Sequence, residues 1–191
     1  VRTLDPDADR VDLGGLGSVK KKTQHFGGGS AFDAFVVYTA SGNRRRFLGV
    51  ECKYAEDLTS SSINVRDPYR TFTERSGFWR DGAIDRLDVK GLQQLWLNAL
   101  LGQSLATTDE FDTGTVVITA LAADRAASKA VDAVRDELLE PDQWLVWSPF
   151  EEVLANVDGH LDWNHHFTRR YLDFSPVQHL LDVDDPRRKD N

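Results

Sequence analysis

Residues 31–54 read AFDAFVVYTASGNRRRFLGVECKY. Positions 31–39 are rich in aromatic and β-branched residues, positions 46–54 (RFLGVECKY) are a second strand-like run, and the turn-forming sequence SGN at 41–43 separates the two, which predicts a β-hairpin. Both runs carry apolar side chains at successive positions, and therefore on both faces of each strand. This pattern is typical of central strands that are covered by helices on both sides. We expect this hairpin to form the centre of the fold.

The hairpin brings two acidic side chains together. If the strands pair symmetrically about Gly42, the numbers of paired residues sum to about 84, which sets Asp33 opposite Glu51. Side chains that face each other across two strands lie roughly 5 Å apart. Because side chains alternate along a strand, Lys53 shares the face of Glu51, whereas Cys52 points into the other layer.

Two carboxylates and one ammonium on a sheet predict a site for a divalent cation. Like charges that face each other destabilise a sheet unless a cation compensates them. Oxygen ligands that leave coordination positions for water suit Mg²⁺ or Mn²⁺. Such an ion would acidify water for attack on phosphorus, and Lys53 would orient that water or stabilise charge on the phosphate. The alternative is an ordinary structural ion pair of Lys53 with Glu51 or Asp33.

The rest of the chain predicts alternating helices and strands. We expect a polar lead-in at 5–9, a loop and short helix at 55–85, a long amphipathic helix at 85–106, a strand at 115–121, a helix at 124–139 capped by Asp124, a strand at 143–147, and further helix before a charged tail at 182–191. This order predicts an α/β fold with a mixed central β-sheet sandwiched between helices. The length fits one domain at 1–181.

Composition narrows the class of protein. The chain has no apolar run of about 18 residues and no charged-then-apolar N-terminus, so we expect no membrane span, no signal peptide and a cytoplasmic protein. Cys52 is the only cysteine, which excludes an internal disulfide and a cysteine-based zinc cluster. The net charge of −8 argues against a general nucleic-acid coat protein. Residues 1–100 nevertheless carry a net charge of +2, so the acidic excess lies in the second half.

The sequences SAFDAF at 30–35 and GVECKY at 49–54 resemble the PD-(D/E)XK nuclease superfamily, in particular its restriction-endonuclease-like members. The shared features are an Asp and a Glu-x-Lys on consecutive strands, followed by a long helix. The resemblance implies a restriction-endonuclease-like core at about 1–121 and a family-specific C-terminal extension at 122–181.

The resemblance also assigns roles to single residues. It implies that Asp33 and Glu51 bind the metal, that the backbone carbonyl of Cys52 adds a ligand, and that Lys53 assists the nucleophile. Some members carry a Gln on the helix after the motif, and Gln94 is the nearest match, with Gln93 beside it. The alternative for both glutamines is a solvated helix face.

Two features differ from the family pattern. Many members have a Glu on a helix before the first strand, whereas residues 1–32 contain no Glu. The Pro that gives the family its name is absent before Asp33. These differences leave open a second function, a PD-(D/E)XK-like fold that serves as a binding or scaffolding module with weak or absent catalysis.

The expected function is a Mg²⁺- or Mn²⁺-dependent nuclease that hydrolyses phosphodiester bonds of nucleic acid, with DNA as the expected substrate, in restriction, repair or defence. A homodimer or a partner domain is compatible with it. Residues 18–90 carry a net charge of +4, and their basic and aromatic side chains could contact phosphates and bases. These are Lys20–Lys22, Arg44–Arg46, Arg66, Arg70, Arg75, Arg80 and Arg86, with Tyr69, Phe72, Phe78 and Trp79. A solvated hairpin tip and packed aromatic rings are the alternatives.

A second group of possible metal ligands lies near the end of the chain. Its members are Asp158, His160, Asp162, His165 and His166. They lack the His-x-x-x-His spacing that would put two imidazoles on one face of a helix. We therefore expect a polar surface helix here.

Overall fold

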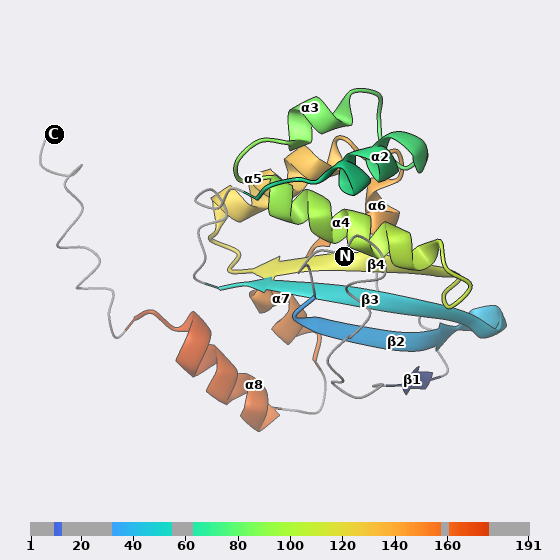
Figure 1. Ribbon diagram of the computed structural model, residues 1–191. Coiled ribbons are helices and arrows are strands. Elements are labelled where there is room, and N and C mark those ends of the chain that lie inside the picture. Colours follow the sequence, from blue (N-terminus) through green and yellow to red (C-terminus); the bar gives the residue numbers. More distant parts are fainter. Residues whose placement is uncertain (1–9, 13–31, 55–62, 158–160, 176–191) are drawn as a thin grey trace, which may run out of the picture. The chain divides into compact units, whose positions relative to one another are not determined.

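The computed structural model describes residues 10–12, 32–54, 63–157 and 161–175. The chain divides into two compact units, Val1–Pro149 and Phe150–Asn191. The first unit has a five-stranded sheet, and Figure 1 shows its helices α2 to α6 on one side of that sheet. The second unit is helical in its described part.

The elements of the first unit are β1 (Arg10–Asp12), β2 (Ala34–Ala40), the 3₁₀ turn η1 (Ser41–Asn43), β3 (Arg44–Lys53), α2 (Asp67–Arg75), α3 (Ala83–Leu87), α4 (Gln93–Ala106), β4 (Thr113–Ala120), α5 (Arg125–Arg135), α6 (Pro141–Trp144) and β5 (Leu145–Trp147). The second unit has α7 (Phe150–Ala155), α8 (Leu161–Phe167) and the π-helical turn η2 (Thr168–Leu172). None of the helices that the structure describes is both long and apolar enough to cross a membrane.

The sheet confirms the predicted α/β class with a mixed sheet. Its strands follow chain order from β1 to β5. β1, β2 and β3 are antiparallel neighbours, whereas β3, β4 and β5 run parallel. β3 is therefore a central strand that joins the antiparallel half to the parallel half.

β2 and β3 form the predicted hairpin. Ala34 pairs with Val50 and Phe35 with Gly49, which is the predicted register with paired numbers summing to 84. Gly42 and Asn43 have φ angles of 73° and 58° in the turn, a left-handed conformation that glycine and asparagine adopt at low cost. The hairpin is thus specified by its turn as well as by its apolar strands.

The predicted long helix at 85–106 is wrong in one respect, because two helices occupy this region. α3 ends at Leu87 and α4 begins at Gln93. Gly91 lies between them with a φ of 94°, which no right-handed helix can contain. The apolar periodicity continued across this break, so the sequence pattern did not reveal it.

Two other boundaries also differ. The expected strand at 143–147 begins only at Leu145, because α6 starts at Pro141, a residue that favours the first turn of a helix. Residues 10–12, where the sequence predicted no strand, form β1 along β2. The predicted helix at 124–139 is present as α5 but ends at Arg135, and the Asp124 side chain caps it as predicted by accepting from the Ala127 backbone N–H at 2.9 Å. The predicted charged tail at 182–191 lies outside the described residues.

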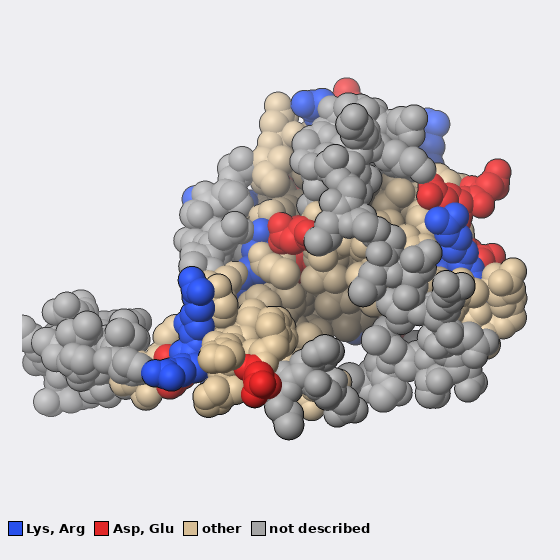
Figure 2. Space-filling model, turned by 90° about the horizontal axis from the view of Figure 1, so that it is seen from below, with Lys and Arg blue, Asp and Glu red and all other residues tan. Residues whose placement is uncertain are grey.

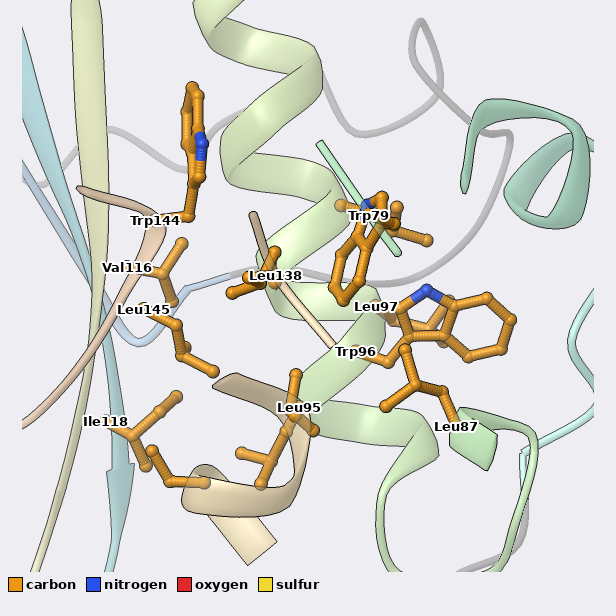
Figure 3. Packing of buried hydrophobic residues seen from close by; sticks show 14 of the residues in the cluster. Trp79, Leu87, Leu95, Trp96, Leu97, Val116, Ile118, Leu138, Trp144 and Leu145 are labelled. Atoms are coloured by element: carbon orange, nitrogen blue, oxygen red, sulfur yellow. The ribbon is translucent and has the colours of Figure 1, made fainter. Parts of the chain in front are cut away.

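The main core lies between α4 and the parallel half of the sheet. Val116 and Ile118 of β4 and Leu145 of β5 are fully buried and belong to one cluster with Leu95 of α4, and Figure 3 labels all four among the side chains of this cluster. A second cluster joins Leu101 and Leu105 of α4 to Phe47 and Phe111. Because close-packed interiors resist displacement, α4 is held firmly over β3 and β4.

Candidate active site

The last residues of β3 place charged groups on a buried face. Along β3 every second residue from Phe47 to Lys53 is buried, including Glu51, whereas Leu48, Val50 and Cys52 are half-buried. Glu51 is only 5% exposed and Lys53 only 3%. Charged side chains are rarely buried to this extent unless they are paired, so their contacts decide what this site can do.

Glu51 is held by two donors from different elements. The Lys53 Nζ atom lies 2.7 Å from Glu51 Oε1. Gln94, the second residue of α4, donates its Nε2 to the same oxygen at 3.0 Å. The structure therefore brings Glu51, Lys53 and Gln94 together, and the solvated-face alternative for Gln94 is wrong.

Asp33 lies directly before β2 and is exposed. It follows the last paired position, Ala34 with Val50, so the same register continued by one residue would set it opposite Glu51. Its Oδ2 atom accepts a hydrogen bond from the Cys52 backbone N–H at 2.7 Å. The N–H and C=O of one residue in an extended strand point to the same side, so the Cys52 carbonyl also faces the Asp33 side of β3.

The pKa of the Cys52 thiol depends on the charges around it. Burial raises the pKa of this thiol, and the negative charges of Asp33 and Glu51 raise that pKa further, while Lys53 lowers it. Both carboxylates are thus close enough to oppose formation of a thiolate. The two predicted metal-binding acids act on one small region of the sheet.

The raised pKa of Cys52 predicts slow alkylation in the metal-free protein. Because the thiolate is the reacting species, iodoacetamide should modify native Cys52 more slowly at pH 8 than the unfolded chain, with the midpoint of the rate against pH displaced upward. In Asp33→Asn one of the charges that raises this pKa is gone, so the midpoint should fall. Mass spectrometry of the single cysteine in EDTA measures both rates. An unchanged midpoint in Asp33→Asn would contradict the proximity of the two side chains.

The donor set of this site fits Mg²⁺ or Mn²⁺. Two carboxylates and one backbone carbonyl are hard oxygen ligands, and they leave coordination positions for water and phosphate oxygens. No group of three or more His, Cys, Asp or Glu side chains suited to a metal occurs in the part of the chain that the structure describes. A closed cage of side chains, as zinc prefers for structural sites, is therefore absent from those residues. The residues present fit an ion that keeps part of its water shell.

Comparison with known proteins supports the same conclusion. A family model described as the PD-(D/E)XK nuclease superfamily matches residues 18–173. The chain belongs to the PD-(D/E)XK nuclease superfamily. The matched residues include α5 to α8 as well as strands β2 to β5. No curated protein and no solved structure matches the chain.

The predicted nucleic-acid contacts are only partly available in this superfamily member. Arg70 and Arg86 form ion pairs with Asp88 and Glu137. Tyr69 and Trp79 are buried, so these two rings pack in the core as the alternative interpretation held. On the face shown in Figure 2, the visible basic side chains form small groups with acidic ones nearby rather than one continuous patch. Lys20–Lys22 lie outside the described residues.

The second group of possible ligands shows no metal site among its described members. Asp162, His165 and His166 are exposed on α8. The remaining two, Asp158 and His160, lie outside the described residues. The described members agree with the expected polar surface helix.

One buried group beside the site was not predicted from the sequence. The solvated-face alternative for Gln93 is wrong, because this residue is buried and bonded to Asp88 and to the backbone of Ile63. Gln93 stands next to the candidate site residue Gln94 in the sequence. The apolar spacing continues across the α3–α4 break, however, and gives no indication that Gln93 is buried.

Proposed function

We propose that this chain is a Mg²⁺- or Mn²⁺-dependent nuclease that hydrolyses phosphodiester bonds of nucleic acid, with DNA as the expected substrate, in restriction, repair or defence. The observation that carries the proposal is the buried Glu51–Lys53 pair on a central strand, beside Asp33 bonded to the backbone of Cys52. Membership of a nuclease superfamily supports the same class of reaction.

Each residue has a distinct role in this proposal. Asp33, Glu51 and the Cys52 carbonyl would hold the divalent ion. The ion, when bound, supplies Lewis-acid chemistry that lowers the pKa of water and neutralises charge on the phosphate. Lys53 orients the attacking water and donates to a phosphate oxygen in the transition state. Gln94 fixes the Glu51 carboxylate through its bond to Oε1.

The Glu51–Lys53 pair serves the site in two states. Without a cation, Lys53 compensates the buried charge of Glu51, which would otherwise be costly. A bound cation would be a further positive partner of Glu51, which would allow the Lys53 ammonium to turn towards the phosphate. The structural ion pair that was the alternative interpretation is therefore compatible with a catalytic one.

The proposal predicts that the Asp33 carboxylate is needed for metal-dependent cleavage. With Mg²⁺ or Mn²⁺, the wild type should cut plasmid and linear DNA, whereas Asp33→Asn should cut at least about 100-fold more slowly, because the amide removes an anionic ligand. EDTA should stop cleavage by the wild type. Gel analysis of the DNA over time measures the rates.

Asp112→Asn is a matched control for this experiment. Asp112 Oδ2 accepts from the Arg45 backbone N–H at 2.6 Å, the same kind of contact that Asp33 makes, but at the other end of β3. Its cleavage rate should stay within about twofold of the wild type. Equal cleavage by wild type and Asp33→Asn, or cleavage that persists in EDTA, would contradict the assignment. DNA binding without cleavage at any ion concentration would instead favour the binding or scaffolding module.

A further inference from the structure

Gln93 is the first residue of α4. Its side chain is only 7% exposed and makes two hydrogen bonds. Its Oε1 accepts from the Ile63 backbone N–H at 2.8 Å. Its Nε2 donates to Asp88 Oδ1 at 2.7 Å. The amide thus satisfies one donor and one acceptor at once.

The contacts of Gln93 connect four parts of the first unit. Ile63 belongs to the segment that precedes α2, and Asp88 lies between α3 and α4. The other oxygen of Asp88, Oδ2, forms an ion pair with Arg70 of α2. We call Ile63, Arg70, Asp88 and Gln93 the Gln93 network. It ties the start of α4 to α2 and to the chain that follows β3.

The first turn of α4 is packed in the core through Leu95 and Trp96, and Trp96 Nε1 donates to Thr73 Oγ1 of α2 at 3.1 Å, but the start of the turn has no side-chain cap. Leu92 at the N-cap position makes no side-chain capping bond, although most helices use a polar residue there. The next residue after Gln93 is Gln94, whose Nε2 bonds to Glu51. A small displacement of this turn would therefore move the Gln94 amide away from Glu51, and misplacements of about 1 Å can cost a large part of a catalytic rate.

We propose that Gln93 is a positioning residue of the active site. Its bonds to Ile63 and Asp88 hold the first turn of α4 where Gln94 can fix the Glu51 carboxylate. Gln93 touches no reacting group and acts through Gln94. The effect on cleavage rests on the proposed nuclease function, whereas the effect on the Gln94–Glu51 contact does not.

Gln93→Glu combined with Asp88→Asn reverses the direction of the hydrogen bond between these two side chains, and this reversal tests the Gln93 network. Gln93→Glu keeps an acceptor for Ile63 but sets a carboxylate against that of Asp88, which should displace the turn. Adding Asp88→Asn restores a donor–acceptor pair with the roles exchanged. Gln103→Met is the control, because Gln103 is a fully buried glutamine of the same helix that bonds to Trp79 rather than to the site. Gln93→Met, which removes both contacts without adding charge, replaces Gln93→Glu if the latter does not fold.

The first readout does not depend on cleavage. The side-chain amide signal of Gln94 in a ¹⁵N NMR spectrum is assigned by its loss in Gln94→Leu. We expect this signal to move in Gln93→Glu, to return towards its wild-type position in the Gln93→Glu/Asp88→Asn double variant, and to stay in place in Gln103→Met. A wild-type signal in a folded Gln93→Glu protein, or no return in the double variant, would overturn the inference.

The second readout separates positioning from substrate binding. In Gln93→Glu, kcat for DNA cleavage should fall roughly 10- to 100-fold with KM changed by less than about twofold, and kcat should recover to within about threefold in the double variant. Gln103→Met should keep kcat within about twofold of the wild type. An equal loss of kcat in Gln103→Met would mean a general loss of structure and would overturn the inference. If the wild type cuts no DNA with either ion, the proposed function fails and the Gln94 signal alone decides the role of Gln93.

Discussion

Glu51→Gln is expected to lower the rate of metal-dependent DNA cleavage by at least about a thousandfold. Glutamine fills almost the same volume and keeps an oxygen that can accept from both Lys53 and Gln94. What it removes is the negative charge that, in our proposal, binds the divalent ion. Single-turnover cleavage rates over a range of Mg²⁺ and Mn²⁺ concentrations measure this loss, and a high ion concentration should recover only a small part of it.

The stability of this variant must be measured beside its activity. Lys53 is 3% exposed, so Glu51→Gln removes a negative charge that lies 2.7 Å from a buried ammonium, which is expected to lower stability. Glu137→Gln is a suitable control, because Glu137 is paired with Arg86 at 2.6 Å but belongs to no part of the site. Its cleavage rate should stay within about twofold of the wild type. A folded Glu51→Gln protein with wild-type cleavage would exclude Glu51 as a ligand of the catalytic ion.

The hairpin was predictable because its signals are local. A turn sequence fixes where the chain reverses, and apolar residues on both sides of it fix the strands. Once Gly42 is the centre, the register follows by counting, and the pairing of Ala34 with Val50 agrees with that count. Alternation along β3 then sets Glu51 and Lys53 on one face, as the burial of both side chains bears out.

Features that depend on distant contacts were not predictable in the same way. β1 exists through its pairing with β2, and its three residues show no strand pattern of their own. The break between α3 and α4 needs one glycine in a left-handed conformation, which apolar spacing does not reveal. The burial of Gln93 follows from that break, because the amide bonds to Asp88 in the connection it creates.

The Lys53 ammonium compensates the buried negative charge of Glu51. In Lys53→Met the Glu51 carboxylate loses its closest positive partner, and removal of one partner of a buried ion pair typically costs about 3–5 kcal/mol. We expect a loss of this size in the free energy of unfolding in EDTA, measured by urea denaturation. Lys129→Met, at an exposed position of α5, should change it by less than about 0.5 kcal/mol.

A divalent ion should restore much of that loss, and this response separates a metal site from a purely structural pair. Binding to the folded state alone stabilises a protein by about 2.7 kcal/mol when the free ligand is at 100 times its Kd. In Lys53→Met the ion becomes the main positive partner of Glu51, so Mn²⁺ or Mg²⁺ should stabilise this variant more than the wild type. The measurements are made in calcium-free buffer. A parallel Asp33→Asn/Lys53→Met protein, which lacks one carboxylate ligand, shows whether the response needs both acids. An equal response of wild type, Lys53→Met and the double variant would mean that no ion binds between Asp33 and Glu51, and Lys53 would then be only the structural partner of Glu51.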